Sequence, residues 1–307
     1  MNTAIVGHTG FVGSNIYRSY SFDYCYNSKN IKEAFGTEPD LLVFSGIRAE
    51  MFTANNYPEK DYASIIEAYE NIVKINPKRI VLISTISVYP DLTNGNELTM
   101  INESSLSTYG KNRHILEQLV ANQFDNSHII RLPALFGYNL KKNFIYDIIN
   151  YIPGLLREDK YQELLVSSSF SSCYQDRGDG FYKCVVQDIE TKKELRSFFE
   201  RIGFSALNFT DSRSTYQYFN LANLWDVIQV VIKNDLRLLT ITSEPIRSSE
   251  LYQLVYGKAF VNEINSNYPV QNLRSVHADL FGGEDGYLYS KKGVLCEILD
   301  FINEQQR

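Results

Sequence analysis

The feature that most constrains this chain is a short apolar run that leads directly into a loop with three evenly spaced glycines. Residues 4–6 read AIV, and residues 7–13 read GHTGFVG. In a strand–loop–helix unit, Gly7 allows the tight turn, Gly10 lets the backbone approach a pyrophosphate, and Gly13 lets the helix pack closely on the strand. The N-terminus of the helix can then receive phosphate groups. The loop therefore predicts a dinucleotide site formed by Gly7, Thr9, Gly10, Phe11, Val12 and Gly13.

Apolar runs of strand length alternate with helical patterns through the first half of the chain. This alternation is typical of a parallel sheet built from strand–helix–strand units. We expect strands at residues 3–6, 22–26, 41–44, 79–84 and 128–132. We expect helices over residues 62–74 and 107–122. The predicted fold class is α/β, with a Rossmann-like doubly wound parallel sheet.

The regular pattern breaks after residue 150. Residues 151 to about 212 are polar, aromatic and irregular, and we expect a loop or a small lobe there. Helical spacing returns over 221–233, followed by a strand-like run at 237–242 and an amphipathic helix over 292–303. We therefore expect a dinucleotide-binding domain and a smaller C-terminal substrate-binding lobe. The first comprises residues 1–150 plus about 214–243, and the second comprises about 151–213 plus 244–307.

Composition and charge exclude several classes of protein. The 307 residues are 44% hydrophobic, enough for a full core, and the formal net charge is −6. An acidic chain offers no basic field for nucleic acid or anionic lipid, so we expect neither as a partner. The longest apolar runs have strand length, far short of the roughly 20 residues of a membrane span.

The cysteines bear on metal binding and on the compartment. The four of them are scattered, with no CxxC pair and no neighbouring His at metal-ligand spacing. We therefore expect reduced thiols and no metal site. We also expect a cytoplasmic location, with no signal peptide ahead of the glycine loop.

Three further motifs follow the fourth predicted strand. Residues 84–90 read STISVYP, residues 109–113 read YGKNR, and residues 131–137 read RLPALFG. Each motif is common alone, but with the glycine loop they occur in a specific order and at specific spacings over nearly the whole chain. In these residues the sequence resembles the extended short-chain dehydrogenase/reductase family, which contains nucleotide-sugar epimerases, dehydratases and reductases.

The resemblance implies catalytic roles for three residues. Thr85 matches the catalytic Ser/Thr of the family, and Tyr109 matches its catalytic tyrosine. Moving a hydride to or from an alcohol carbon needs a proton donor or acceptor on its oxygen, and a tyrosine with a pKa lowered from about 10 serves near neutrality. The usual lysine four residues after the tyrosine is Arg113 here. Arg113 shares a helical face with Tyr109, so we expect its charge to lower the tyrosine pKa and its donors to hold the nicotinamide ribose.

The end of the second predicted strand bears on the choice of cofactor. NAD-specific members place an acidic residue there to bind the ribose 2′-hydroxyl. This chain has Asn27, Ser28 and Lys29 instead. Asn27 and Ser28 can hydrogen-bond a 2′-phosphate and Lys29 can neutralise it, so we expect NADP, with NAD as the alternative. Ser45 follows the third predicted strand, where the family has a small-residue segment near the cofactor.

Two residues match substrate-binding elements of the family. Asn143 matches an asparagine that contacts the sugar-nucleotide pyrophosphate, and Arg213 matches an arginine that binds a substrate phosphate. Family dehydratases carry Asp-Glu directly after the catalytic threonine, whereas this chain has Ile86 and Ser87, which disfavours dehydration. The resemblance thus implies a nucleotide-sugar substrate, and it also implies a homodimer.

Reduction of a keto sugar by hydride transfer, with Tyr109 as proton donor, is the function that the sequence favours. Ile86 supplies no second acid or base, and the expected preference for NADP favours reduction. Two alternatives stay open. One is a 4-epimerase that holds NAD tightly. The other is a catalytically weakened, cofactor-binding regulatory subunit, which the arginine at position 113 suggests.

Overall fold

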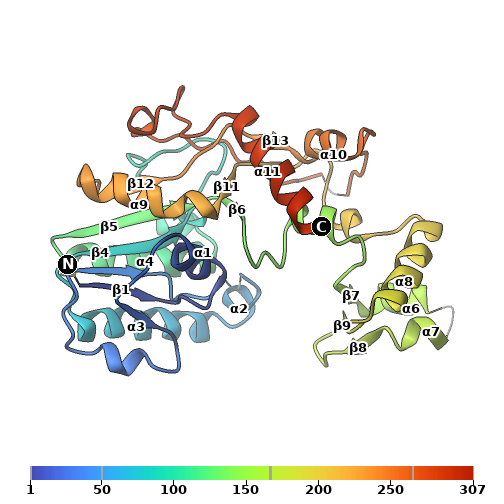
Figure 1. The fold of residues 1–307 in the computed structure, drawn as a ribbon, viewed down its shortest axis with the longest axis horizontal. Helices are drawn as coiled ribbons and strands as arrows, with labels where there is room; N and C mark the ends of the chain where they lie inside the picture. The colour runs from blue at the N-terminus through green and yellow to red at the C-terminus, as the bar shows by residue number, and fades with distance from the viewer. Residues whose placement is uncertain (1, 50, 166–167, 265, 307) are drawn as a thin grey trace. The chain divides into compact units, whose positions relative to one another are not determined.

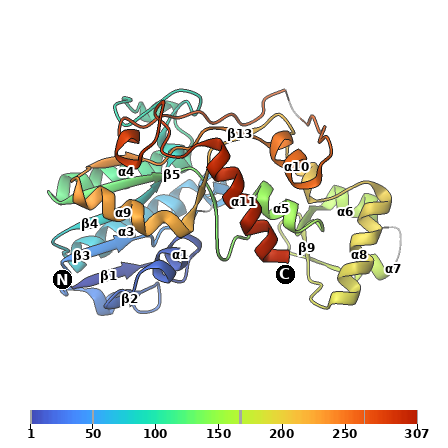
Figure 2. The same cartoon turned by 45° about the horizontal axis from the view of Figure 1, so that its top comes forward.

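A parallel sheet forms the centre of the larger part of the molecule. The computed structural model describes residues 2–49, 51–165, 168–264 and 266–306. Within them the sheet has six strands in the order β12-β5-β4-β3-β1-β2, and every neighbouring pair is parallel (Figure 1). The strands are β1 Thr3–Val6, β2 Tyr24–Tyr26, β3 Leu41–Phe44, β4 Ile80–Thr85, β5 Ser127–Leu132 and β12 Leu238–Thr240. In Figure 2 the labels β5, β4, β3, β1 and β2 follow one another in this order from top to bottom.

These strands form where the sequence is continuously apolar. All residues of β1, β3 and β5 are buried, as expected for parallel strands that are covered on both faces. The predicted α/β fold with a Rossmann-like sheet is confirmed. The second strand is shorter than predicted, because its pairing with β1 begins only at Tyr24. Phe22 packs instead against Trp225, with the ring centroids 5.4 Å apart.

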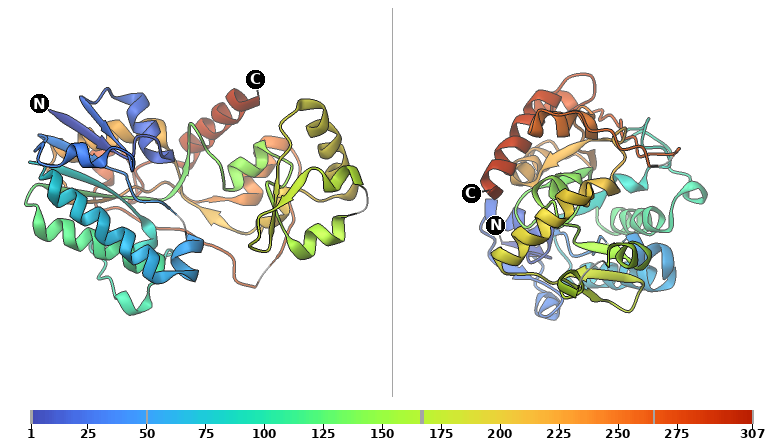
Figure 3. Two further views of the ribbon diagram at one scale, coloured as in Figure 1. Left: turned by 90° about the horizontal axis from the view of Figure 1, so that it is seen from below. Right: turned by 90° about the vertical axis from the view of Figure 1, so that its right-hand side faces the viewer.

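Helices cover the two faces of the sheet. On one face, α1 Phe11–Ser19 and α9 Leu224–Lys233 bury Ile16, Leu224 and Ile228 against the strands. On the other face, α3 Pro58–Ile75 and α4 Thr108–Gln123 lie side by side (Figure 3, left). Their buried residues include Ile65, Ile72, Leu116 and Val120. The predicted helices at 62–74 and 107–122 are thus both present.

The chain divides into two compact units, which are described separately. The larger unit, containing the six-stranded sheet, comprises Met1–Leu140, Thr215–Ile246 and Pro269–Phe301, and the smaller comprises Lys141–Ser214, Arg247–Tyr268 and Ile302–Arg307. The larger unit also contains α2 Met51–Asn56 and the parallel pair of β6 Ala134–Phe136 with β11 Tyr218–Asn220. Two further elements are the short pair of β10 Thr215–Tyr216 with β13 Ile246–Arg247 and the helix α11 Lys291–Gln306.

These units differ in two places from the expected division. Residues 269–301 belong with the sheet, whereas we expected them in the lobe. The physical reason is the buried Gln217, whose amide donates to the carbonyl of Leu273 at 2.9 Å and accepts from its N–H at 2.7 Å. Leu288 also joins the core beside the sheet. Residues 141–150, expected with the dinucleotide-binding domain, belong to the smaller unit.

Residues 151 to about 212, where we expected a loop or a small lobe, contain regular helices and strands and belong to the smaller unit. Its three-stranded antiparallel sheet consists of β7 Leu155–Arg157, β9 Phe181–Cys184 and β8 Tyr174–Asp176. Its helices are α5 Phe144–Ile149, α6 Glu158–Leu164, α7 Ser168–Ser171, α8 Ile189–Ile202 and α10 Ser248–Tyr256. Tyr161, Phe170 and Phe199 form the centre of a separate aromatic core. Among the described residues, no helix is both long and apolar enough to cross a membrane.

Candidate active site

The glycine loop forms a tight corner at the carboxyl end of β1. Gly7 has a φ of +93°, and a Cβ there would lie 2.6 Å from the carbonyl oxygen of Ser45. A Cβ on Gly13 would lie 2.1 Å from the carbonyl oxygen of Gly7. Both distances are below any normal contact, so only glycine lets the turn, the strand and α1 approach this closely. These are the steric roles that the sequence predicts for Gly7 and Gly13.

The N-terminus of α1 suits a phosphate group. Gly10 is the N-cap residue and has no side chain to bond the first N–H groups of the helix. Thr9 and Gly10 are exposed, whereas Phe11 and Val12 are half-buried and pack against the core. A helix that begins without a side-chain cap leaves backbone donors at its positive end, the arrangement that binds anions. The residues present therefore fit a dinucleotide pyrophosphate.

The ends of β2 and β3 flank this loop. The side-chain oxygen of Asn27 accepts from the N–H of Lys29 at 2.9 Å, and Ser28 and Lys29 are exposed beside it. Their exposure is compatible with a 2′-phosphate. The hydroxyl of Ser45 donates to the carbonyl of Val6 at 3.0 Å, so it joins the ends of β1 and β3. The ring of His8 contacts the carbonyl of Tyr26 at 3.0 Å and further fixes the loop.

Thr85 and Tyr109 are brought into one region by a close approach of α4 to the end of β4. Thr85 ends β4, and its hydroxyl accepts from the N–H of Ser87 at 3.2 Å, which caps a short 3-10 helix, Ile86–Val88. Tyr109 lies in the first turn of α4, next to Gly110. A Cβ on Gly110 would lie 2.0 Å from the carbonyl oxygen of Ser87. This glycine therefore lets the start of α4 touch the segment that follows Thr85.

Tyr109 is buried beside an arginine. The Cζ atom of Arg113 lies 4.3 Å from the centroid of the Tyr109 ring, as expected one helical turn away. Burial raises the pKa of Tyr109 above its ordinary value, and the charge and hydrogen bond of Arg113 offset only part of that effect. Arg113 therefore lowers the pKa of Tyr109 as expected, but burial outweighs it, so the net pKa in the protein alone is raised.

Arg113 is bound to a carboxylate that the sequence analysis missed. Its Nη1 lies 2.7 Å from Oδ2 of Asp61, and its Nη2 lies 3.1 Å from Oδ1 of the same residue. Asp61 belongs to α3 and is buried. A signal was present in the sequence: Asp61 stands four residues before Ile65 on the apolar face of α3, where a carboxylate needs a partner.

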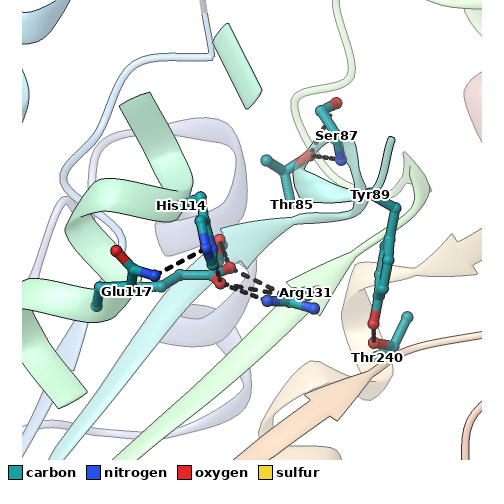
Figure 4. Close-up of polar contacts among 9 residues, drawn as sticks. Thr85, Ser87, Tyr89, His114, Glu117, Arg131 and Thr240 are labelled. Carbon is teal, nitrogen blue, oxygen red and sulfur yellow. Dashed lines mark hydrogen bonds and ion pairs between the residues drawn. The ribbon is translucent and has the colours of Figure 1, made fainter. Parts of the chain in front are cut away.

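A second buried network joins α4 to β4 and β5 (Figure 4). Glu117, two turns along α4 from Tyr109, binds Arg131 of β5 with Oε2 to Nη2 at 2.6 Å and also accepts from Ser84 of β4. Burial raises the pKa of Glu117, but hydrogen bonds and the Arg131 charge outweigh it and hold the pKa below its usual value. These contacts fix α4 against the strand that ends at Thr85.

Asn143 and Arg213 belong to the smaller unit, apart from the residues described above. Asn143 has a φ of +116°, and its side-chain oxygen accepts from the N–H of Tyr146 at 3.1 Å to cap α5. Arg213 donates to Asp211 at 2.7 Å and 2.9 Å and to Glu263 at 2.9 Å. The part of the chain that the structure describes contains no cluster of side chains suited to a metal ion.

Comparison with known proteins supports the fold. No protein-family model matches the chain, and no curated protein sequence matches it. Solved structures do match. The dTDP-4-dehydrorhamnose reductase from Yersinia enterocolitica has a TM-score of 0.64 and 14% identity, with 98% of each chain covered. The reductase from Bacillus anthracis, in complex with NADP, has a TM-score of 0.64 and 12% identity, covering 98% of this chain and 97% of that one.

An epimerase structure matches over a similar length. The UDP-glucose 4-epimerase from Thermotoga maritima, with UDP-glucose, has a TM-score of 0.62 and 13% identity, with 100% of both chains covered. The structural neighbours are thus enzymes of the extended short-chain dehydrogenase/reductase family, which the sequence resembles. At these identities the likeness establishes the fold.

Proposed function

We propose that this chain is an NADP-dependent oxidoreductase that reduces a nucleotide-linked keto sugar. The observation that carries the proposal is the approach of Gly110 to Ser87, which joins the segments of Thr85 and Tyr109 at the carboxyl end of β4. The glycine loop follows the carboxyl end of β1 in the same parallel sheet. Ligands of such sheets bind beyond the carboxyl ends of the strands. The shared fold with NADP-bound and sugar-nucleotide-bound enzymes supports the same function.

The loop and the N-terminus of α1 form the proposed cofactor site. Backbone donors at Thr9, Gly10, Phe11 and Val12 face the pyrophosphate, in the space that Gly7 and Gly13 allow. Asn27, Ser28 and Lys29 bind the 2′-phosphate at the end of β2, and Ser45 lines the site from the end of β3, on the other side of β1. The reduced dinucleotide, when bound, supplies the hydride.

The proposed chemistry of the protein is the delivery of a proton. As the carbonyl carbon is reduced, the carbonyl oxygen gains negative charge, and the phenol of Tyr109 donates its proton to that oxygen. The hydroxyl of Thr85 donates a hydrogen bond to the same oxygen. Arg113, against the ring, stabilises the phenolate that remains.

The smaller unit is the proposed substrate-binding lobe. Asn143 and Arg213 are the candidates for the sugar-nucleotide diphosphate. Arg213 already binds Asp211 and Glu263, so a phosphate would replace at least one of these carboxylates at its guanidinium. The two positions after Thr85 are Ile86, which is buried, and Ser87, which is half-buried. Neither supplies a carboxylate for dehydration.

The proposal is tested by cofactor titration followed by turnover. We expect purified protein to bind NADPH more tightly than NADH, and to consume NADPH when a 4-keto-sugar nucleotide is added. Tyr109→Phe should lower kcat by about 10²–10⁴-fold, because the proton donor is lost. Tyr62→Phe, on the exposed side of α3, is the matched control and should retain activity.

Three other results would contradict the reductase assignment. Tightly retained NAD with conversion of a sugar nucleotide to its 4-epimer would favour the epimerase. Dinucleotide binding without turnover of any keto-sugar nucleotide would favour a regulatory subunit. Binding of neither NADPH nor NADH would exclude both enzyme assignments.

A further inference from the structure

The guanidinium of Arg113 is enclosed on several sides. Asp61 accepts from both of its terminal nitrogens, at 2.7 and 3.1 Å. The backbone carbonyl of Arg48 accepts from Nη2 at 2.8 Å, and the ring of Tyr109 covers the group. Both N–H bonds of Nη2 therefore end on protein oxygens, and the residue is only 5% exposed.

Asp61 is held in place equally well. Its Oδ2 also accepts from the side-chain amide of Asn112 at 2.8 Å, so both carboxylate oxygens are bonded. The residue is 5% exposed. A bidentate pair between buried Arg and Asp fixes the plane of the guanidinium as well as its distance. The orientation of Arg113 under Tyr109 is thus set from α3.

The pair also determines the charge beside Tyr109. A lone arginine cation at this distance would strongly favour the phenolate. Here the cation lies 2.7 Å from a carboxylate, whose charge opposes that of Arg113 at the phenol and adds to the effect of burial, which is the largest cause of the raised Tyr109 pKa. The 3-10 helix Ile86–Val88 and α2 also pack near this end of α4 and contain no charged residue, whereas Lys111 on α4 is paired with Glu103 at 3.9 Å. Arg113 and Asp61 are the charged groups that act on Tyr109.

We infer that Asp61 is a positioning residue that holds Arg113 against the ring of Tyr109 and opposes its charge there, so that the phenol keeps its proton more firmly than it would beside a lone arginine. Arg113 consequently packs on the ring of Tyr109 and binds Asp61 of α3. Both hydrogens of its Nη2 are already donated to protein oxygens, so this atom is not available to a ribose hydroxyl. The inference rests on the proposed function in one respect: a protonated phenol is the form that donates a proton during reduction. The same site is poorly prepared to remove a proton from an alcohol.

The test is a direct titration of Tyr109 by NMR. Protein labelled with ¹³Cζ-tyrosine is titrated without dinucleotide or substrate, and the Tyr109 resonance is identified by its loss in Tyr109→Phe. In the wild type we expect the Tyr109 phenol to titrate above the ordinary range of tyrosine, because the side chain is buried. Asp61→Asn removes the carboxylate that opposes the Arg113 charge and should lower the Tyr109 pKa.

Two further variants separate charge from structure. Arg113→Gln leaves Asp61 uncompensated and should raise the Tyr109 pKa, and the double variant Asp61→Asn/Arg113→Gln should return it toward the wild-type value. If Asp61→Asn alone does not fold, the effect of Asp61 is measured in the absence of Arg113. It is then the difference in Tyr109 pKa between Arg113→Gln and the double variant. Asp211→Asn breaks a similar bidentate pair in the smaller unit and should leave the Tyr109 resonance unchanged.

An equal Tyr109 pKa in the wild type and in folded Asp61→Asn would overturn the inference. Because the titration uses neither cofactor nor substrate, a wild type without turnover would contradict the proposed function and leave this result intact. Conversely, an active reductase with an unchanged Tyr109 pKa in Asp61→Asn would contradict only the role of Asp61.

Discussion

At residue 113, arginine in place of lysine changes which partners the side chain needs. A guanidinium is planar, always charged and has a rigid fork of donors, so a buried arginine requires a carboxylate in matching geometry. Asp61 supplies that carboxylate here. Arg213 shows the same behaviour with Asp211. The two arginines that the sequence offers for ribose and phosphate binding therefore already hold carboxylates within the protein.

Asp147 is the residue whose titration should affect how the free energy of unfolding depends on pH. It lies in α5, and burial raises its pKa from 3.8 to about 7. Between these values the folded state binds more protons at Asp147 than the unfolded state, so stability falls as the pH rises from about 4 to 7. Asp147→Asn should remove this dependence. The free energy of unfolding of the variant, relative to that of the wild type, should be about 1–2 kcal/mol higher at pH 8 than at pH 5. This value allows for partial solvation of the carboxyl group.

Urea denaturation at the two pH values measures this difference. Asp159→Asn is the control, because Asp159 is an exposed carboxylate of the same unit whose pKa is lowered by its hydrogen bond to Arg157. That variant should show no gain at the higher pH. If the free energy of unfolding changes by the same amount between pH 5 and pH 8 in Asp147→Asn and in the wild type, the assignment of a raised pKa to Asp147 is contradicted.

The sequence predicts part of the candidate site at this scale. The spacing of Tyr109 and Arg113 places them on one helical face, and the structure stacks them. The partner Asp61 could not be predicted as a pair, because α3 and α4 meet only through tertiary packing across the sheet face. The net pKa of Tyr109 depends on burial, which the local sequence does not determine.

At the scale of elements, α4 connects the candidate site to the sheet through polar contacts. Tyr109 and Arg113 lie near its start, and Glu117 binds Arg131 and Ser84 two turns later. Arg131 also lies against the ring of Tyr89, with its Cζ atom 4.7 Å from the centroid. The register of α4 on β4 and β5 is therefore specified by directional bonds at several points along the helix.

Gly110→Ala tests how closely this helix must approach β4. Alanine usually stabilises a helix relative to glycine by about 1 kcal/mol. Here the added Cβ would lie 2.0 Å from the carbonyl oxygen of Ser87, so we expect a net loss of about 1–3 kcal/mol. Thermal and urea denaturation measure the loss.

Gly293→Ala provides the matched control for this helix prediction. Gly293 is exposed in the first turn of α11, and the nearest atom to its Cβ would be the flexible Ser290 hydroxyl at 3.3 Å. This variant should be neutral or slightly stabilised. A Gly110→Ala protein as stable as Gly293→Ala would show that α4 does not depend on this close approach.

Elements of the sheet are predictable to different degrees. The strands at 3–6 and 41–44 have the predicted bounds, because short, fully buried parallel strands appear as continuous apolar runs. Strands such as β7 and β8 have three residues each. Three residues are too few to show an alternating pattern, so their pairing depends on contacts distant in sequence.

At the scale of the whole molecule, the two units have separate apolar cores. The core of the smaller unit is largely aromatic, with Tyr161 stacked on Tyr182 at a centroid distance of 3.8 Å. The cores beside the sheet are mostly aliphatic. The proposed dinucleotide site depends on residues of the larger unit, whereas Asn143 and Arg213 depend on the smaller one.

Core truncation should therefore affect the two proposed binding functions differently. Phe199→Ala removes a fully buried ring and should destabilise the smaller unit by about 3–5 kcal/mol. NADPH titration should give a Kd close to that of the wild type, provided that the larger unit stays folded. Ile72→Ala, in the core under α3, should instead destabilise the larger unit and weaken NADPH binding. Loss of NADPH binding in Phe199→Ala, with the larger unit still folded, would contradict this independence.

The position of β12 at the edge of the sheet has a consequence for biosynthesis. β12 pairs with β5, yet all of residues 141–214 are translated between the two strands. While the ribosome makes that intervening segment, the outer edge of β5 has no strand to bond. An open edge of this kind readily recruits other chains. A nascent or truncated product that stops before Leu238 is consequently the species most in need of a chaperone.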